Sequence, residues 1–244
     1  MGLITKLKRV SKRLSQDLYR ARIHKVPSVV RSVRERSLTY LSEDALCNLH
    51  EHVIRIEKHQ IQGDFIEAGC ALGGSAIVIA SAKLEDRRFD IYDVFARIPA
   101  PSSQDGPDVH SRYETITSGN SKGIGGERYY GYNDNLLESV QDNFRLLGLS
   151  PAENDIHFVK GLLQDTLHPE NDVAFAHIDC DWYESVKTCL QRIVPRLVCG
   201  GVIIVDDYFT WSGCRKAVDE FFADKLDDFE FQQNPRLSIS RRCF

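Results

Sequence analysis

Two hydrophobic patterns alternate along most of the chain. Short runs rich in Val, Ile and Phe are typical of strands, and apolar residues spaced three or four apart predict amphipathic helices. Strands are expected at residues 64–69, 88–95, 155–161, 172–179, 201–207 and 236–242. Helices are expected at residues 42–60, 73–84, 133–148, 183–197 and 213–226. Strands that alternate with helices predict an α/β fold with a doubly wound, mainly parallel sheet.

The expected strand at residues 201–207 is continuously apolar until it ends in two acids. Its sequence, GVIIVDD, follows Gly200, and the unbroken Val-Ile-Ile-Val run predicts a strand buried on both faces. Ligands of open α/β sheets bind outside the carboxyl ends of such strands. Asp206 and Asp207 are therefore candidate ligand-binding residues.

Residues 96–132 interrupt the alternation. This segment is rich in Gly, Ser and Pro and shows neither hydrophobic period. A loop of this length is usually a lid over a site or a disordered segment, and we expect a lid. Its arginine and tyrosine side chains could hold a polar ligand; they are Arg112, Tyr113, Arg128, Tyr129 and Tyr130.

The first 36 residues are strongly basic. They hold 11 Lys and Arg against two acidic residues, whereas the rest of the chain holds 20 against 33. The spacing of their apolar residues predicts a basic amphipathic helix, which packs on its own domain or a partner subunit, or lies on an anionic membrane surface. Nucleic acid is disfavoured because no aromatic platform accompanies the charge. We expect a helical extension at residues 1–40 and one domain at residues 41–244, with the lid as an insertion.

The composition is that of an ordinary globular protein. The 244 residues are 42% hydrophobic, and no stretch approaches the roughly 18 consecutive apolar residues of a membrane span. Because the start lacks the apolar core of a signal peptide, a cytoplasmic protein is expected. The seven cysteines are scattered, form no C-x-x-C pair, and are expected to be reduced and mostly in the core.

A glycine-rich turn follows the first expected strand. In FIEAGCALGGSA, Glu67 stands at the strand end, and Gly69, Gly73 and Gly74 lie on the turn into a helix. Glycines let the backbone approach a ligand, and the amino end of a helix favours anionic groups. The turn lacks the G-x-G-x-x-G of dinucleotide sites, because Ala71 occupies the second glycine position. The spacing E-x-G-x-x-x-G-G resembles the first motif of class I methyltransferases, which bind S-adenosylmethionine.

Asp93 ends the next expected strand, about 26 residues after Glu67. A carboxylate at this place in a nucleotide-binding α/β fold accepts hydrogen bonds from ribose hydroxyls. The alternative is a solvated strand end. Together with the glycine-rich turn, the position favours ribose binding.

Acidic residues also end two later strands. Asp179 follows one apolar run in HIDCDWYES, and Asp206 and Asp207 follow the next. If these strands are neighbours, three carboxylates converge and repel one another unless a cation lies among them. Ligation by oxygen alone suits Mg²⁺, with Ca²⁺ or Mn²⁺ as substitutes. The alternative, an Asp that caps each following helix, explains one acid at each turn but not two.

Five segments between about residues 40 and 225 form a recognisable set: FIEAGCALGGSA, GERYYGYNDNLLESV, GLLQDTL, HIDCDWYES and VIIVDDYFTWSGCRKAVDEFF. Together they resemble the macrocin O-methyltransferase family (TylF, MycF and NovP type). The resemblance implies a class I, Rossmann-like fold and an enzyme that uses Mg²⁺ and S-adenosylmethionine to methylate a sugar hydroxyl. The acceptor would be a nucleotide sugar, a glycan or a glycosylated metabolite, and a homo-oligomer is expected.

The resemblance also implies roles for individual residues. The implied cofactor contacts are Glu67, Gly69, Gly73, Gly74, Ser75, Asp93 and, near the adenine, Asp165. The implied metal ligands are Asp179, Asp206 and Asp207. Asp181 is the candidate general base, and His177, which titrates nearer neutrality, is the alternative.

The chain departs from the family pattern at DVFARIPAP and in residues 99–128, which leaves the acceptor open. Three other functions stay open: a metal-dependent phosphatase, a D-x-D glycosyltransferase and a methyltransferase-like scaffold without catalysis. The two other enzymes are disfavoured because they would leave the glycine-rich turn and Asp93 unused. A complete set of three carboxylates argues against a scaffold.

Overall fold

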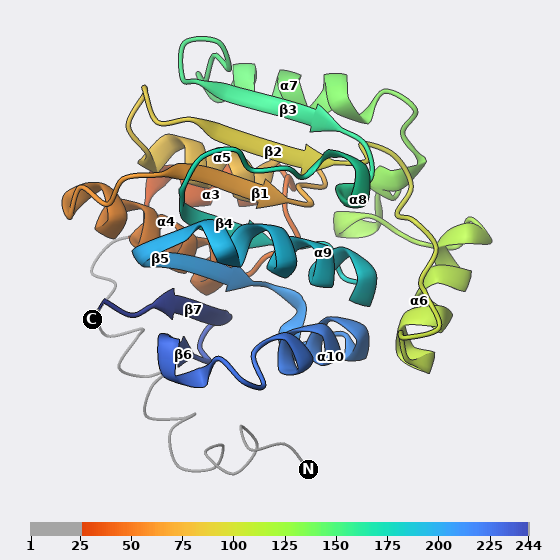
Figure 1. Cartoon of the computed structure of the whole chain (residues 1–244). Coiled ribbons are helices and arrows are strands. Elements are labelled where there is room, and N and C mark those ends of the chain that lie inside the picture. Colours follow the sequence, from red (N-terminus) through yellow and green to blue (C-terminus); the bar gives the residue numbers. More distant parts are fainter. Residues whose placement is uncertain (1–25, 244) are drawn as a thin grey trace.

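The computed structural model describes residues 26–243, and the expected helix at the basic start of the chain lies largely outside this range. Its sheet has the strand order β3-β2-β1-β4-β5-β7-β6 (Figure 1). The strands are β1 (Asp64–Ala68), β2 (Phe89–Asp93), β3 (Ile156–Lys160), β4 (Val173–Ile178), β5 (Leu197–Val205), β6 (Phe229–Gln232) and β7 (Leu237–Arg241). Neighbours from β3 to β5 are parallel, and β7 is antiparallel to both β5 and β6. The predicted doubly wound, mainly parallel sheet is confirmed.

Helices cover both faces of the sheet. One face carries α3 (Ser28–Glu35), α4 (Glu43–Lys58), α5 (Gly74–Ala82) and α7 (Leu136–Leu146). The other carries α8 (Leu163–Thr166), α9 (Tyr183–Ile193) and α10 (Ser212–Phe221), which lie in front of the sheet in Figure 1. Short 3-10 helices are η1 (Ile124–Gly126), η2 (Tyr130–Tyr132), η3 (Val194–Arg196), η4 (Asp207–Phe209) and η5 (Leu226–Asp228).

Alternate residues of the central strands supply two separate cores. On β1, Phe65 belongs to the core under α4 and α5, whereas Ile66 belongs to the core under α9 and α10. Successive side chains of a strand point to opposite faces, so a strand without polar alternation fills both cores. Residues 202–205 of β5 divide in the same way, and each is at most 1% exposed. The prediction that this strand is buried on both faces is confirmed.

Helix α3 packs into the domain instead of forming part of a separate extension. Val30 and Val33 are fully buried in the core beneath α4 and α5, while Arg31 and Arg34 are exposed on the outer side. Helix α3 is therefore amphipathic, with an apolar face in the core and basic residues on its outer side. The expected domain boundary at residue 40 does not separate this helix from the core.

The insertion contains a helix that the hydrophobic pattern did not predict. Helix α6 (Pro107–Thr117) begins after Gly106 with a proline at its first position, which favours helix initiation. Only Val109 and Ile116 are buried within it. Two apolar residues are too few to give a periodic stripe, which explains why the segment resembled an unstructured loop.

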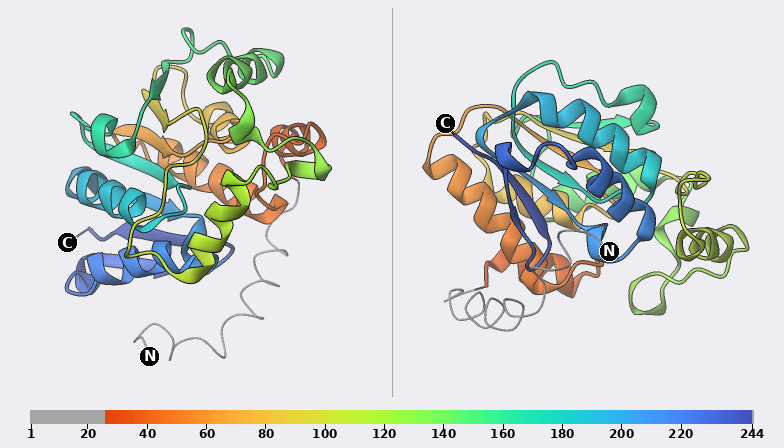
Figure 2. Two further views of the ribbon diagram at one scale, coloured as in Figure 1. Left: turned by 90° about the vertical axis from the view of Figure 1, so that its right-hand side faces the viewer. Right: turned by 60° about the horizontal axis from the view of Figure 1, so that its bottom comes forward.

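Two carboxylates of the insertion anchor it to the domain. Asp105 accepts a hydrogen bond from the backbone N–H of Tyr183 (2.8 Å), at the start of α9. Asp108 accepts one from the backbone N–H of Ser212 (2.9 Å), at the start of α10. Figure 2 (left) looks onto the carboxyl ends of the parallel strands, and the insertion crosses in front of them.

The expectation that all seven cysteines are reduced is wrong. Cys199 and Cys243 form a disulfide with a Cα–Cα distance of 5.1 Å. The antiparallel register of β5 and β7, in which Val202 pairs with Ser240, brings these distant cysteines opposite each other. Of the other five, four are buried as expected.

No helix within residues 26–243 is both long and apolar enough to cross a membrane.

Candidate active site

The glycine-rich turn between β1 and α5 is tightly packed. Gly69 has a φ of +85°, and a Cβ at this position would lie 2.0 Å from the carbonyl oxygen of Asp179. A Cβ on Gly74 would lie 2.4 Å from the carbonyl oxygen of Leu38. Both positions therefore require glycine, and Gly69 brings the turn against the residue that follows β4.

Asp93, at the end of β2, holds this turn in place. Its Oδ2 accepts hydrogen bonds from the backbone N–H groups of Cys70 (2.8 Å) and Ala71 (3.4 Å), and its Oδ1 accepts one from that of Phe95 (2.7 Å). Burial raises the pKa of the Asp93 carboxyl above its usual value, and the three backbone donors oppose this rise. Each carboxylate oxygen can accept more than one hydrogen bond, so Asp93 retains capacity for a ligand.

A cavity opens at the carboxyl ends of β1, β2 and β4. It is lined by Gly69 and Asp93, by Asp179 and Asp181 after β4, and by Tyr130 of the insertion. The cavity therefore connects the glycine-rich turn to the acidic residues that follow β4.

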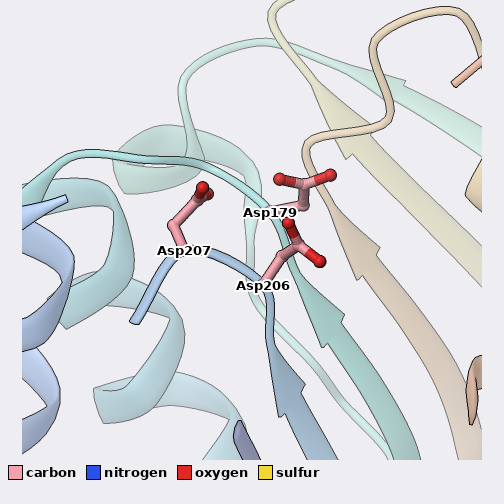
Figure 3. Close-up of side chains that lie close together, drawn as sticks. All are labelled: Asp179, Asp206 and Asp207. Carbon is pink, nitrogen blue, oxygen red and sulfur yellow. The ribbon is translucent and has the colours of Figure 1, made fainter. Parts of the chain in front are cut away.

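Three carboxylates meet at the ends of β4 and β5 (Figure 3). One oxygen from each of Asp179, Asp206 and Asp207 lies within 4.8 Å of the other two. The two strands are adjacent and parallel, so their carboxyl ends reach the same edge of the sheet. The structure thus brings these three side chains together as the sequence predicted.

The surroundings of this acidic cluster disfavour negative charge. Burial raises the pKa of Asp179 well above its usual range, and the charge of Asp206 raises it further. Burial also raises the pKa of Asp207, with Asp181 as the next cause. Within the described residues, Oδ2 of Asp207 is buried without a hydrogen-bond partner. A cation among these oxygens would relieve both the repulsion and the missing contact.

Arg236 contacts the cluster and was not identified from the sequence. Its Nε lies 2.6 Å from Oδ1 of Asp206. Because Val205 of β5 pairs with Leu237 of β7, the residue before Leu237 stands opposite the residue after Val205. An antiparallel register of this kind is not visible in the sequence of either strand.

Asp181 lines the same cavity two residues after Asp179. Its φ of +59° is uncommon for a residue other than glycine. Burial raises its pKa to about 7, with a further rise from Asp206, while a hydrogen bond from Trp211 and the charge of Arg112 act in the opposite direction. Asp181 is therefore placed to contact a ligand in the cavity.

Glu67 and His177 lie within the sheet instead of at the cavity. They are register partners on β1 and β4, and Nδ1 of His177 is 2.8 Å from Oε1 of Glu67. Both side chains are 0% exposed, and neither lines the cavity. Glu67 shares its side of β1 with Phe65, so it belongs to the face under α4 and α5.

The remaining candidate residues for cofactor binding do not line the cavity. Ser75 is buried in the first turn of α5, behind the glycine-rich turn, and neither it nor Gly73 lines the cavity. Asp165 is exposed on α8 and does not line the cavity, whereas its neighbour Gln164 does. Gln164 could not be identified from the sequence, because a single polar residue on a short helix has no distinguishing pattern.

Two curated O-methyltransferases are similar in sequence to this chain. A tetracenomycin enzyme of Streptomyces olivaceus, the 8-demethyl-8-(2,3-dimethoxy-alpha-L-rhamnosyl)-tetracenomycin-C 4'-O-methyltransferase, is 31% identical over 185 residues, which cover 72% of this chain and 64% of the relative. The demethyldecarbamoylnovobiocin O-methyltransferase of Streptomyces niveus is 30% identical over 191 residues, which cover 76% of this chain and 68% of the relative. The chain thus spans about two thirds of the length of these relatives.

A solved structure and a family model also match this chain. The solved structure of the O-methyltransferase NovP matches with a TM-score of 0.70 at 25% identity, covering 84% of this chain and 83% of NovP. The family model of macrocin-O-methyltransferase (TylF) matches residues 31–228. The chain therefore belongs to the macrocin-O-methyltransferase (TylF) family.

Proposed function

We propose that this protein is an S-adenosylmethionine-dependent O-methyltransferase that methylates a sugar hydroxyl. The sugar is part of a glycosylated metabolite, a nucleotide sugar or a glycan. The observation that carries the proposal is a single cavity lined both by Asp93 and Gly69 and by Asp179 and Asp181. Support for a sugar comes from the relative named as a 4'-O-methyltransferase of a rhamnosyl tetracenomycin.

The cavity residues fit S-adenosylmethionine. Three backbone donors fix the carboxylate of Asp93, which keeps acceptor capacity for ribose hydroxyls. Gly69 has no side chain, so a ligand can approach the backbone of the turn. When bound, S-adenosylmethionine supplies an activated methyl group. The protein then has to bind and orient the acceptor hydroxyl and exclude water.

The acidic cluster fits a divalent cation. Asp179, Asp206 and Asp207 would hold Mg²⁺, which prefers oxygen ligands, and the buried oxygen of Asp207 lacks any other partner among residues 26–243. Arg236 offsets one of the three negative charges through Asp206, which leaves two for the ion. When bound, the ion lowers the pKa of a hydroxyl group.

Asp181 is the proposed general base. It lines the cavity, whereas His177 is bound to Glu67 inside the sheet. Asp181 would accept the proton of the acceptor hydroxyl. Glu67 and His177 are then a structural pair that holds β1 against β4.

Binding of S-adenosylhomocysteine, with and without Mg²⁺, tests the proposal by thermal shift. A methyltransferase must be stabilised by the nucleoside, whereas a phosphatase or a glycosyltransferase need not be. Transfer of a labelled methyl group to a panel of sugars and nucleotide sugars, followed by mass spectrometry, separates an enzyme from a non-catalytic scaffold. Absence of any stabilisation by S-adenosylhomocysteine would contradict the proposal.

A further inference from the structure

We infer that Arg112 forms an anion-binding part of the acceptor site, so that the acceptor carries a carboxylate or phosphate group beside its sugar hydroxyl. This inference rests on the proposed function, because it concerns the substrate of the same cavity. The structure distinguishes among the arginines of the insertion, which sequence reasoning alone could not do.

Arg112 is linked to the cavity through two tyrosine rings. On α6, its guanidinium carbon lies 5.5 Å from the centroid of the Tyr129 ring. The Tyr129 ring centroid is 4.5 Å from that of Tyr130, and Tyr130 lines the cavity together with Asp179 and Asp181. The insertion that contains these residues crosses in front of the carboxyl ends of the strands in Figure 2 (left). The guanidinium therefore lies outside the cavity wall, behind Tyr129 and next to the part of the wall that Tyr130 forms.

The only ring contact, hydrogen bond or ion pair of the Arg112 guanidinium among the described residues is its contact with the Tyr129 ring. Among residues 26–243 it has no carboxylate oxygen within 4.0 Å and makes no hydrogen bond, although it is partly buried. In contrast, Arg128 donates a hydrogen bond to the carbonyl oxygen of Tyr132. Arg97 is exposed, and its guanidinium lies over the Tyr132 ring, which does not line the cavity.

The chemistry of Arg112 suits an oxyanion. A guanidinium presents five N–H donors in a planar arrangement that matches a carboxylate or phosphate, and packing on an aromatic ring leaves these edge donors available. Its positive charge also acts on the neighbouring ring, because it lowers the pKa of Tyr129 against the effect of burial.

The charge balance of the cavity makes such a residue necessary for an anionic acceptor. Asp179 and Asp181 line the cavity, and Asp206 and Asp207 adjoin it, so an oxyanion near them is repelled. A cation beside the cavity wall would hold the anionic group away from these carboxylates and direct the sugar end toward them.

The competing explanation is that Arg112 serves only as a counter-charge for Asp181. That role affects every acceptor equally, whereas an anion site affects charged acceptors alone. The two explanations therefore differ in the ratio between acceptors rather than in overall activity.

Calorimetric titration of the protein with S-adenosylhomocysteine and Mg²⁺ tests the inference at constant ionic strength. The ligands are the methyl glycosides of glucose and galactose, the corresponding methyl uronides and the corresponding sugar 1-phosphates. At least one charged ligand should bind about tenfold or more tightly than its neutral parent, and Arg112→Gln should abolish that advantage. The neutral sugars should keep their affinity within about twofold, and Arg112→Lys should retain part of the advantage.

Two comparisons make the test specific. Arg128→Gln removes another positive charge of the insertion, one that donates to the carbonyl oxygen of Tyr132, and should preserve the advantage of the charged ligand. A gain for the uronide alone identifies a carboxylate, and a gain for the phosphate alone identifies a phosphate.

Three outcomes would overturn the inference. In the first, the parent protein binds charged and neutral ligands with equal affinity. In the second, the tighter binding of the charged ligand survives Arg112→Gln. In the third, Arg112→Gln weakens the binding of charged and neutral ligands equally. The same titrations also report whether S-adenosylhomocysteine binds. If the nucleoside binds but charged ligands have no advantage, only the inference about Arg112 fails. If the nucleoside does not bind, the proposed function fails.

Discussion

The two acidic parts of the cavity differ in how the protein satisfies their carboxylates. Asp93 is buried, but backbone N–H groups donate to both of its oxygens. In the acidic cluster at the ends of β4 and β5, Asp206 and Asp207 are also buried, yet Oδ2 of Asp207 has no partner within the described residues. The charge of Asp206 also disfavours the ionised form of Asp179.

This difference indicates which ligand each part can accept. A carboxylate that the backbone already satisfies is stable without a cation, and its spare lone pairs suit neutral hydroxyl groups. Carboxylates that are buried together with unpaired oxygens are costly until a positive charge joins them. Substitutions in the two parts should therefore change different measurements.

Replacing Asp206 or Asp207 by Asn has the largest expected effect. Turnover should fall by at least about 1000-fold, because an amide cannot supply the negative charge that holds a divalent ion. The affinity for S-adenosylhomocysteine, measured by calorimetry, should stay within about tenfold, because the nucleoside is bound by the other part of the cavity. Full activity of the parent protein in excess EDTA would contradict a metal requirement.

The variant Asp93→Ala should show the opposite behaviour. Loss of charge-assisted hydrogen bonds to two ribose hydroxyls should cost about 2 to 4 kcal/mol, or roughly 30- to 1000-fold in affinity for S-adenosylhomocysteine. Stabilisation by Mg²⁺ in a thermal shift should remain. If the variant binds the nucleoside as the parent does, Asp93 only holds the glycine-rich turn.

Substitutions of Glu67 and His177 should change the stability of the protein rather than its binding of S-adenosylhomocysteine. His177→Ala leaves a buried carboxylate oxygen without its partner, which should lower the free energy of unfolding by about 1 to 3 kcal/mol in urea titrations. The folded protein should bind S-adenosylhomocysteine within about threefold of the parent, and the double variant Glu67→Leu, His177→Leu should recover part of the stability. A collapse of turnover without loss of stability would restore His177 as the base.

The parallel part of the fold was predictable because its signals are local. Apolar runs and amphipathic stretches predicted β1 to β5 and the helices α4, α5, α7, α9 and α10. Neighbouring parallel strands then brought Asp179 to Asp206 and Asp207 without any knowledge of side-chain contacts. Asp93 was placed at the end of β2 by the same reasoning.

The parts that were missed depend on contacts between distant segments. The pairing of β7 with β5 brings Arg236 to Asp206 and Cys199 to Cys243, and neither sequence carries a sign of its register. Helix α6 depends on end contacts such as that of Asp108 with Ser212 more than on an apolar stripe. Local periodicity cannot reveal interactions of this kind.

The smallest expected effect separates Gln164 from Asp165 on α8. Gln164 lines the cavity, and Asp165 does not. Gln164→Ala should weaken S-adenosylhomocysteine about 2- to 10-fold, the value of one neutral hydrogen bond, while Asp165→Ala should change the affinity less than about twofold. Both residues belong to the same short helix, so damage to the helix would weaken both variants equally, and only a difference between them reports a direct contact. If Asp165→Ala is the weaker binder in calorimetry, the role implied by the family resemblance is correct and Gln164 is only its neighbour.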